Sequence, residues 1–407
     1  MSSTEKSYRL YGPPFKNDPH PVYAAMREEA PLYRRVGKKS GRSIWFVTRY
    51  DDAVTILRDH QRFVKDFRRT LSPEQLAEAP PEPRLVRLLS HHMLNLDAPD
   101  HTRLRALVSK AFTARMVNQM EDRVQAIAHK CIDKVESQGK MDLINAYAFP
   151  LPIVVIAELL GIPKRDHHRF RHWSAAFVSP FMSEKEIQKK TPMLELFIRY
   201  LHDLFEKRRT APQDDLLTAL IEAEEAGERL SEDELYSMII LLIVAGHETA
   251  ANLIGNGMLA LLQNPDQWQL LQQQPELALA ATEEFIRLDG PVERATTRFA
   301  TEDVLMDGQL IRRGDAVNVV LAATSRDPAQ FTDPDKLDIL REDNRHLGFG
   351  LGVHYCVGAP LARMEVPIAL NVLAQRLPNL RLADPEQPLR WRTGPIIRGL
   401  KNLPVVW

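Results

Sequence analysis

The sequence predicts a mainly α-helical protein with a smaller β-rich part, and two patterns support this fold class. Apolar residues recur at helical spacing through most of residues 95–290 and again over 358–377. Short runs with aromatic and β-branched residues, such as Ser43–Thr48, occur near 30–50, 295–322 and 385–407. Because no repeat and no long low-complexity linker divides the 407 residues, we expect one domain over 1–407.

Composition excludes several classes of partner. The 53 Lys and Arg residues nearly balance the 54 Asp and Glu residues, so the net charge of −1 implies no nucleic-acid or anionic-membrane partner. The N-terminus lacks the apolar core of a signal peptide, and the longest apolar run, Met238–Gly246, is too short to span a bilayer. With only two cysteines, the chain is typical of a reduced, cytoplasmic protein. The helical pattern around Cys131 indicates a packing role for that side chain.

Helices are expected along most of the chain, and one of them is long. Ser231 and Glu234 have the spacing of a capping box, which opens a helix that Asn264-Pro265 ends. Because this helix is apolar almost all round through Met238–Ala245, we expect it to cross the interior. Residues 64–90 are expected to be rich in loops, with strands at 299–304, 309–311 and 316–320. The other helices are expected at 22–29, 51–59, 102–112, 114–138, 147–160, 164–177, 185–209 and 216–227.

The stretch His346–Glu365 holds the most informative functional pattern. Cys356 follows three alternating glycines that begin at Gly348, and Gly358 comes two residues later. Glycines allow a backbone to turn tightly and to approach a flat ligand. A helical pattern follows, and the N-terminus of a helix lowers the pKa of a thiol. Such a thiolate is a metal ligand or a nucleophile, and the competing interpretation is a buried, inert cysteine.

This stretch resembles the haem-binding loop of the cytochrome P-450 family of haem-thiolate monooxygenases. The resemblance implies a triangular single-domain fold that binds haem b, with Cys356 as the axial iron ligand. Covalent c-type haem is excluded, because a Cys-x-x-Cys-His motif is absent. All six fixed positions of the family's loop are present: Phe349, Gly350, Gly352, His354, Cys356 and Gly358.

A second segment of the long helix, Ala245–Thr249, also resembles the family. Its His-Glu pair opens the zinc motif H-E-x-x-H, but the fifth position is Ala251, so a zinc site is excluded. The resemblance implies that Gly246 relaxes the helix where dioxygen binds, that Thr249 donates a hydrogen bond there, and that Glu248 supplies protons through water. The alternative is a hydroxyl that bonds the carbonyl four residues earlier on its own helix.

Two further sets of residues match the family by position. Glu284 and Arg287 match its Glu-x-x-Arg helix, whose ion pair, by resemblance, is buried and braces the cysteine loop. Either Lys336 or Arg341 is expected to complete that network. Four residues match the family's partners of the two haem propionates: His101, Arg105, Arg298 and His354.

The resemblance implies that one oxygen atom of O₂ enters a hydrophobic substrate, by hydroxylation or epoxidation. Electrons would come from separate proteins, such as a ferredoxin and its reductase, docked near Arg105, Lys110 and Arg363. Two other functions stay open. A peroxygenase would use H₂O₂ and usually lacks the acid–alcohol pair found at Glu248-Thr249, whereas a haem-based gas sensor would usually bring a signalling module.

The substrate pocket is expected to be mostly apolar, with Glu293 and Arg294 near its edge. A medium-to-large hydrophobic molecule, such as a macrolide, terpenoid, steroid or fatty acid, would suit it. The expected lining comprises the 60–90 loop, the turn at 177–182, Ile243, Ala245, Val292, Thr296 and Ile396.

Overall fold

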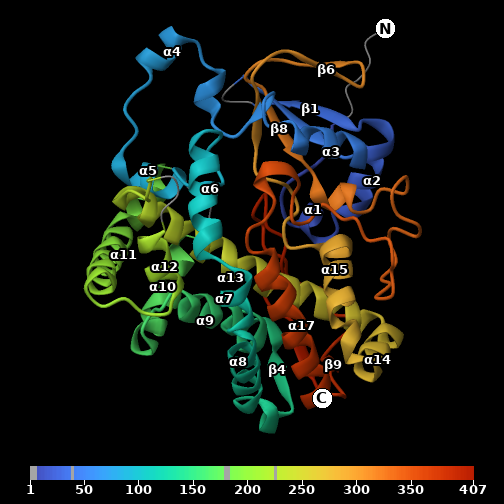
Figure 1. The fold of residues 1–407 in the computed structure, drawn as a ribbon. Helices are drawn as coiled ribbons and strands as arrows, with labels where there is room; N and C mark the ends of the chain where they lie inside the picture. Colours follow the sequence, from blue (N-terminus) through green and yellow to red (C-terminus); the bar gives the residue numbers. More distant parts are fainter. Residues whose placement is uncertain (1–6, 38–40, 178–183, 224–226) are drawn as a thin grey trace. The chain divides into compact units, whose positions relative to one another are not determined.

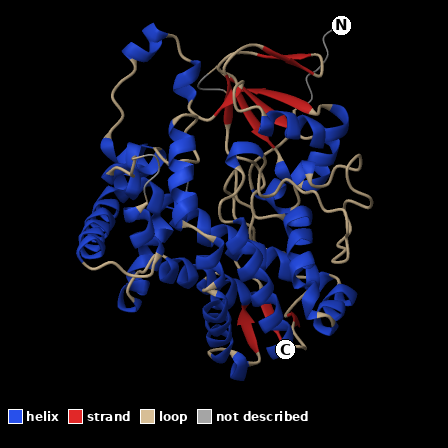
Figure 2. Cartoon of the chain, in the orientation of Figure 1, coloured by secondary structure: helices blue, strands red, loops and turns tan. Residues whose placement is uncertain are grey.

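The computed structural model describes residues 7–37, 41–177, 184–223 and 227–407, and it confirms the mainly α-helical class (Figures 1 and 2). The chain forms two compact units. Unit 1 comprises Met1–Ala79, Gly255–Cys356 and Leu380–Val406, and unit 2 comprises Pro80–Ile254, Val357–Asn379 and Trp407. The expectation of one domain over 1–407 stays a prediction.

Unit 1 contains a five-stranded sheet whose spatial order is β1-β2-β8-β5-β3. The pair β2 and β8 is parallel, and the other neighbours are antiparallel. Alternate side chains such as Trp45, Val47, Val317 and Val319 enter one hydrophobic core with Ile56 of helix α3 (Tyr50–Arg58). The strands are β1 (Leu32–Val36), β2 (Ser43–Val47), β3 (Phe63–Val64), β5 (Arg298–Ala300) and β8 (Ala316–Val319).

Two further strand pairs also belong to unit 1. Strands β6 (Val304–Met306) and β7 (Gln309–Ile311) form an antiparallel hairpin. Asp307 and Gly308 connect them with φ values of 47° and 72°, as an Asp-Gly hairpin turn requires. Near the C-terminus, β9 (Arg381–Leu382) pairs with β10 (Pro404–Val406). Strands therefore occur within the expected regions near 30–50 and 295–322, and β10 lies within 385–407, whereas β9 lies just before that region.

The helices of unit 1 occur before, between and after the strands of this sheet in the sequence. Helix α15 carries Glu284 and Arg287, the two fixed residues of the Glu-x-x-Arg pattern. The helices are α1 (Pro13–Asn17), α2 (His20–Glu29), α3 (Tyr50–Arg58), α4 (Pro73–Glu78), α14 (Pro265–Gln273), α15 (Ala278–Asp289) and α16 (Leu321–Thr324), with short 3₁₀ turns at 67–70, 275–277 and 352–354.

Unit 2 is built almost entirely of helices, with the short strand β4 (Lys140–Asp142) and a π-helical turn at 144–148. Helix α17 packs against α8, and α8 packs against α9. The helices are α5 (Arg84–Ser90), α6 (Asp100–Ala111), α7 (Ala114–Asn118), α8 (Glu121–Asp133), α9 (Pro150–Leu159), α10 (His167–Phe177), α11 (Glu184–Thr210), α12 (Leu216–Glu222) and α17 (Ala359–Arg376).

Helix α13 (Glu232–Gln263) is the long helix that the sequence predicts. The capping box is present, because Ser231 N donates to Glu234 Oε2 over 2.8 Å and Glu234 N donates to Ser231 Oγ over 3.3 Å. The helix ends directly before Asn264-Pro265, as expected. Among the described helices it alone is long and apolar enough to cross a membrane, but 78% of that stretch is buried in the protein, as in the core helix of many water-soluble proteins.

Two expectations about the helices are wrong in detail. The helix expected at 114–138 is divided into α7 and α8, because a turn at Gln119 and Met120 ends α7 with a hydrogen bond from Met120 N to Val117 O. The segment at 64–90 contains α4 and α5 as well as loops. Helix α4 begins with a complete capping box formed by Ser72 and Gln75, with Pro73 at its first position. The scattered prolines of this segment led to its interpretation as loop, although the capping box is a local signal for a helix.

Candidate active site

The two cysteines occupy opposite environments. Cys131 is buried on α8, and burial raises the pKa of its thiol, so it has the predicted packing role. Cys356 is exposed, which is unusual because cysteine is among the residue types most often buried. The Cys356 N–H donates to Phe349 O over 2.9 Å and closes the loop. Cys356 is therefore not the buried cysteine of the competing interpretation.

Glycines let this loop lie directly against two helices of unit 1. A Cβ on Gly352 would come within 2.7 Å of Leu57 O at the end of α3, and one on Gly348 within 2.1 Å of Ile286 Cγ2 on α15. Gly350 and Gly352 also have φ values of 74° and 75°, which favour glycine. Any larger residue at 348 or 352 would push the loop away from its support.

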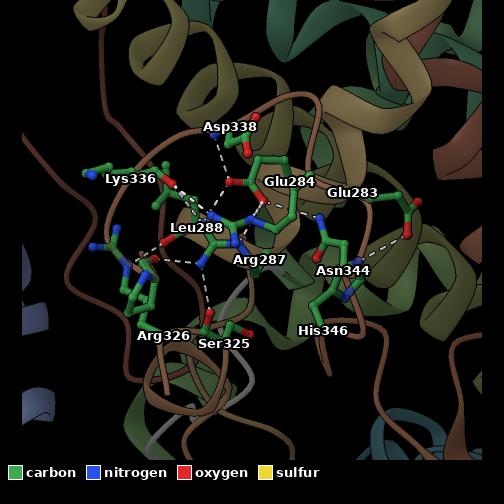
Figure 3. Close-up of polar contacts among 12 residues, drawn as sticks. Glu283, Glu284, Arg287, Leu288, Ser325, Arg326, Lys336, Asp338, Asn344 and His346 are labelled. Atoms are coloured by element: carbon green, nitrogen blue, oxygen red, sulfur yellow. Dashed lines mark hydrogen bonds and ion pairs between the residues drawn. The ribbon is translucent and has the colours of Figure 1, made fainter. Parts of the chain in front are cut away.

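Helix α15 holds the segment before the loop through the carboxylate of Glu284 (Figure 3). Arg287 donates to it twice, from Nε over 2.7 Å and from Nη2 over 2.8 Å. Arg341 Nε donates over 3.1 Å, Asn344 Nδ2 over 3.2 Å and the Asp338 N–H over 3.0 Å. Arg341 therefore completes the ion-pair network that the sequence left open between two residues.

The guanidinium of Arg287 extends this network to backbone carbonyls. Its Nη1 donates to Ser325 O over 3.0 Å and to Pro334 O over 2.6 Å, and its Nη2 donates to Lys336 O over 3.0 Å (Figure 3). Lys336 contributes only this carbonyl, because its ammonium binds Asp333 at the surface. The side chains of Glu284 and Arg287 are both 0% exposed, so the pair is a buried one rather than a surface pair.

A second link joins α15 to the beginning of the cysteine loop. His346 Nε2 lies 3.1 Å from Glu283 Oε2, and His346 Nδ1 accepts from the Gly348 N–H over 3.1 Å (Figure 3). Together with the packing of Gly348 on Ile286, this link fixes the start of the loop at His346, four residues before its first positive-φ glycine, Gly350. The position of Cys356 in unit 1 is thus set by α15.

Arg298 is buried on β5, with 4% of its surface exposed, and its Nη1 donates to Thr296 O over 3.4 Å. Lys65, directly after β3, is 6% exposed and donates to Thr296 Oγ1 over 2.5 Å and to Thr297 O over 2.8 Å. His354 closes the 3₁₀ turn at 352–354 in the same unit. No motif in the sequence marks Lys65, so it is not among the predicted site residues.

Glu293 and Arg294 do not lie free at a pocket edge, so that expectation is wrong. Glu293 accepts from Lys16 Nζ and from Tyr23 Oη, each over 2.5 Å. Arg294 donates to Tyr23 Oη and to Leu10 O. Burial raises the pKa of Tyr23 and lowers that of Lys16, and Glu293 opposes the shift at Lys16. These charges fasten the N-terminal segment to the segment at 291–295.

Two of the expected pocket segments lie side by side in unit 1. Glu293 N donates to Ile396 O over 2.8 Å, and Val292 forms an isolated antiparallel bridge with Ile397. Val292, Thr296 and Ile396 are each partly exposed, as pocket-lining residues would be. Most of the turn expected at 177–182 lies outside the described residues.

In unit 2, the buried part of α13 has one accessible stripe. Ala245 is exposed, and Gly246 and Thr249 are partly exposed, whereas His247 and Glu248 are buried. The positions Ala245 and Thr249 share a helix face because they are four residues apart. Ile243 is fully buried, so this stripe favours Ala245 over Ile243 as a lining residue.

Thr249 Oγ1 donates to Ala245 O over 2.7 Å, which is the carbonyl four residues earlier. The hydroxyl proton is therefore used within the helix, and the oxygen lone pairs are left to accept a hydrogen bond. The helix continues unbroken through Gly246, so the expected relaxation is not seen. Gly246 instead lies close to α9, where a Cβ would come within 3.2 Å of Ile156 Cδ1.

The other candidates in unit 2 lie on α6 and at the start of α17. His101 is buried and Arg105 is partly exposed, one helical turn apart on α6. Gly358 is the N-cap of α17, which begins three residues after Cys356. Among the described residues, no group of three or more His, Cys, Asp or Glu side chains could hold a bare metal ion.

The donor set fits a flat, anionic, thiolate-ligated cofactor. Unit 1 offers an exposed thiol in a glycine loop together with two buried cations, Arg298 and Lys65. Unit 2, considered by itself, has Arg105 one helical turn from His101 on α6, and the accessible stripe of α13 at Ala245 and Thr249. Haem has the corresponding parts, namely an iron that takes a thiolate and propionates that need cationic partners.

Comparisons with known proteins identify what the chain is similar to. Residues 164–390 match the sequence profile of the family described as Cytochrome P450. The chain is 45% identical over 399 residues to the cytochrome P450 monooxygenase PikC of Streptomyces venezuelae, covering 97% of this chain and 92% of that protein. It is 41% identical over 415 residues to the mycinamicin IV hydroxylase/epoxidase of Micromonospora griseorubida, covering 100% of both chains.

The fold is similar to solved structures over nearly the same length. The bacillaene polyketide synthase cytochrome P450 PksS of Bacillus subtilis superposes with a TM-score of 0.91 at 40% sequence identity. The similarity covers 98% of this chain and 99% of that one.

Proposed function

The chain belongs to the cytochrome P450 family and is a monooxygenase, and from that premise we propose that it binds haem b with Cys356 as the axial ligand and oxidises a hydrophobic natural product. The family is haem-thiolate in character and its members generally receive electrons from redox partner proteins. Relatives of this chain act on natural products such as macrolides and polyketides. The proposal extends these family properties to particular residues and to a substrate class.

The observation that carries the proposal is the support beneath Cys356. An exposed thiol lies in a glycine loop, and the segment before that loop is held on α15 by the buried carboxylate of Glu284. Preorganisation of this kind keeps a ligand atom in place when the rest of the site changes. A thiolate donates electron density to haem iron and favours cleavage of the O–O bond, which is the chemistry the bound cofactor would supply.

The chain's own residues would orient the cofactor and deliver protons. Arg298 in unit 1 and His101 with Arg105 in unit 2 would hold the propionates, because guanidinium groups bind carboxylates with two parallel hydrogen bonds. Thr249, whose proton is donated to Ala245 O, would accept a hydrogen bond at the accessible stripe of α13. Glu248, buried beside it, would exchange protons with that site through water.

The substrate would be a medium-to-large hydrophobic molecule of the macrolide or polyketide type. In unit 1, Val292, Thr296 and Ile396 would contact this substrate, and Ala245 is the contact residue proposed in unit 2. The proposed location is the cytoplasm, where a ferredoxin and its reductase would supply the electrons. Arg105, Lys110 and Arg363 would meet an acidic electron donor.

Turnover under ¹⁸O₂ tests this proposal. The purified protein is combined with a surrogate ferredoxin, its reductase, NADPH and a panel of macrolides, polyketides, steroids and fatty acids. We expect a product that carries one ¹⁸O atom from a macrolide or polyketide. Turnover that requires H₂O₂ and proceeds equally well without the reductase would instead indicate a peroxygenase. Incorporation of ¹⁸O only into fatty acids would contradict the proposed substrate class.

A further inference from the structure

Two buried cations of unit 1 converge on one threonine. Lys65 Nζ donates to Thr296 Oγ1 over 2.5 Å and to Thr297 O over 2.8 Å, and Arg298 Nη1 donates to Thr296 O over 3.4 Å. Lys65 is 6% exposed and Arg298 is 4% exposed. Both residues lie at the edge of the same strand pair, β3 with β5. Their charged ends are therefore neighbours inside the protein.

The register of the sheet explains why they meet. Val64, the last residue of β3, pairs with Phe299 of β5, and Lys65 and Arg298 are the residues next to this pair on either strand. Both cations bind Thr296, so their like charges lie close together and repel one another. Burial weakens the screening of that repulsion. An anion that binds both Lys65 and Arg298 would replace this repulsion with two attractive interactions.

We infer that Lys65 is a second cation, beside Arg298, for a haem propionate, an inference that rests on the proposed function. The hydroxyl of Thr296 then acts as a positioning group, because it accepts the hydrogen bond that aligns the Lys65 ammonium. Lys65 keeps a point charge at the site, while the guanidinium of Arg298 supplies directional donors. Lys65, Arg298 and Cys356 all belong to unit 1. These three residues of unit 1 would therefore contribute part of the free energy of haem binding.

Haem transfer to excess apomyoglobin measures the contribution of Lys65. For Lys65→Met we expect haem loss to be about tenfold faster than in the wild type, which corresponds to about 1.4 kcal/mol and is typical of one charge-assisted hydrogen bond. Lys65→Arg keeps the charge and should stay within about twofold of the wild type. Lys336→Met is the matched control, because its ammonium is 74% exposed and binds Asp333.

A modified cofactor separates a propionate contact from a purely structural role of Lys65. The full-length wild type and Lys65→Met are reconstituted with iron protoporphyrin IX dimethyl ester, in which both propionates are neutral esters. We expect the two proteins to lose this cofactor at equal rates. A tenfold difference that persists with the ester would overturn the inference, since it would reflect a loosened β3–β5 edge, and so would unchanged loss of native haem in Lys65→Met.

The proposed function and this inference fail in different ways. A wild type without the ferrous–CO band of a thiolate ligand would contradict the proposed function, whatever residue 65 is. If the wild type and Lys65→Met both show the ferrous–CO band of a thiolate ligand and lose native haem at equal rates, only the role of Lys65 is contradicted.

Discussion

Glu284→Ala removes the acceptor on which the cysteine loop's support converges. The carboxylate accepts five hydrogen bonds, two from Arg287 and one each from Arg341, Asn344 and the Asp338 N–H. The substitution leaves Arg287 buried, with only backbone carbonyls among the contacts described above, and it also releases the chain segment at 338–344. Both effects act on the segment that leads to Cys356.

The expected loss of stability follows from the burial of the pair. Because both side chains are 0% exposed, their interaction is not screened as a surface pair would be. Removing one partner of a buried ion pair costs about 3–5 kcal/mol, since the other charge stays buried without compensation. Folded proteins are stable by only about 5–15 kcal/mol, so we expect much of the Glu284→Ala protein to be isolated without haem or misfolded.

Urea unfolding, followed by far-UV circular dichroism and by the Soret band, measures this loss. Lys336→Ala is the matched control, because it breaks an ion pair three residues apart in the chain whose side chains are 74% and 61% exposed, and it should cost at most about 1 kcal/mol. Glu284→Gln keeps an acceptor without the charge and should fall between the two. A Glu284→Ala protein with full haem content and a loss similar to the control would refute the brace.

The remaining predictions concern the proton path and pH. Thr249→Ala should keep the haem content and the CO spectrum of the wild type, but it should form less product and more H₂O₂ per NADPH consumed. Thr249→Ser, which keeps the hydroxyl, should stay close to the wild type. An unchanged ratio of product to NADPH in Thr249→Ala would exclude the hydroxyl from proton delivery. Burial raises the pKa of Glu365 from 4.5 to about 8. The folded state therefore retains that proton where the unfolded state has lost it, so the free energy of unfolding should fall between about pH 5 and 8. Glu365→Gln should flatten that fall in urea titrations, and an unchanged slope would show that Glu365 does not cause it.

The features that sequence reasoning found have local causes. The capping box at Ser231 and the Asn264-Pro265 stop both act within one helical turn, and α13 begins and ends where they predict. The glycines around Cys356 predict a tight loop, and the loop has positive φ at Gly350 and Gly352. These signals depend only on residues close in the sequence, so they can be recognised without knowledge of the tertiary structure.

The features that it missed depend on residues far apart in the chain. Glu293 is separated from Lys16 by 277 positions, and no local pattern reveals that the two are bonded. The choice between Lys336 and Arg341 depends on which side chain turns toward Glu284, a matter of three-dimensional packing. Gly246 was interpreted as a point of weakness in α13, yet its small size is explained by the approach of Ile156.

The ferrous–CO difference spectrum of the wild type and of two Cys356 variants tests the central claim most directly. The wild type should give the red-shifted Soret band that only a thiolate ligand produces. Cys356→His and Cys356→Ala should both lose that band, while Cys131→Ala, on the buried thiol of α8, should keep it. Survival of the red-shifted band in Cys356→Ala would contradict the assignment of Cys356 as the iron ligand.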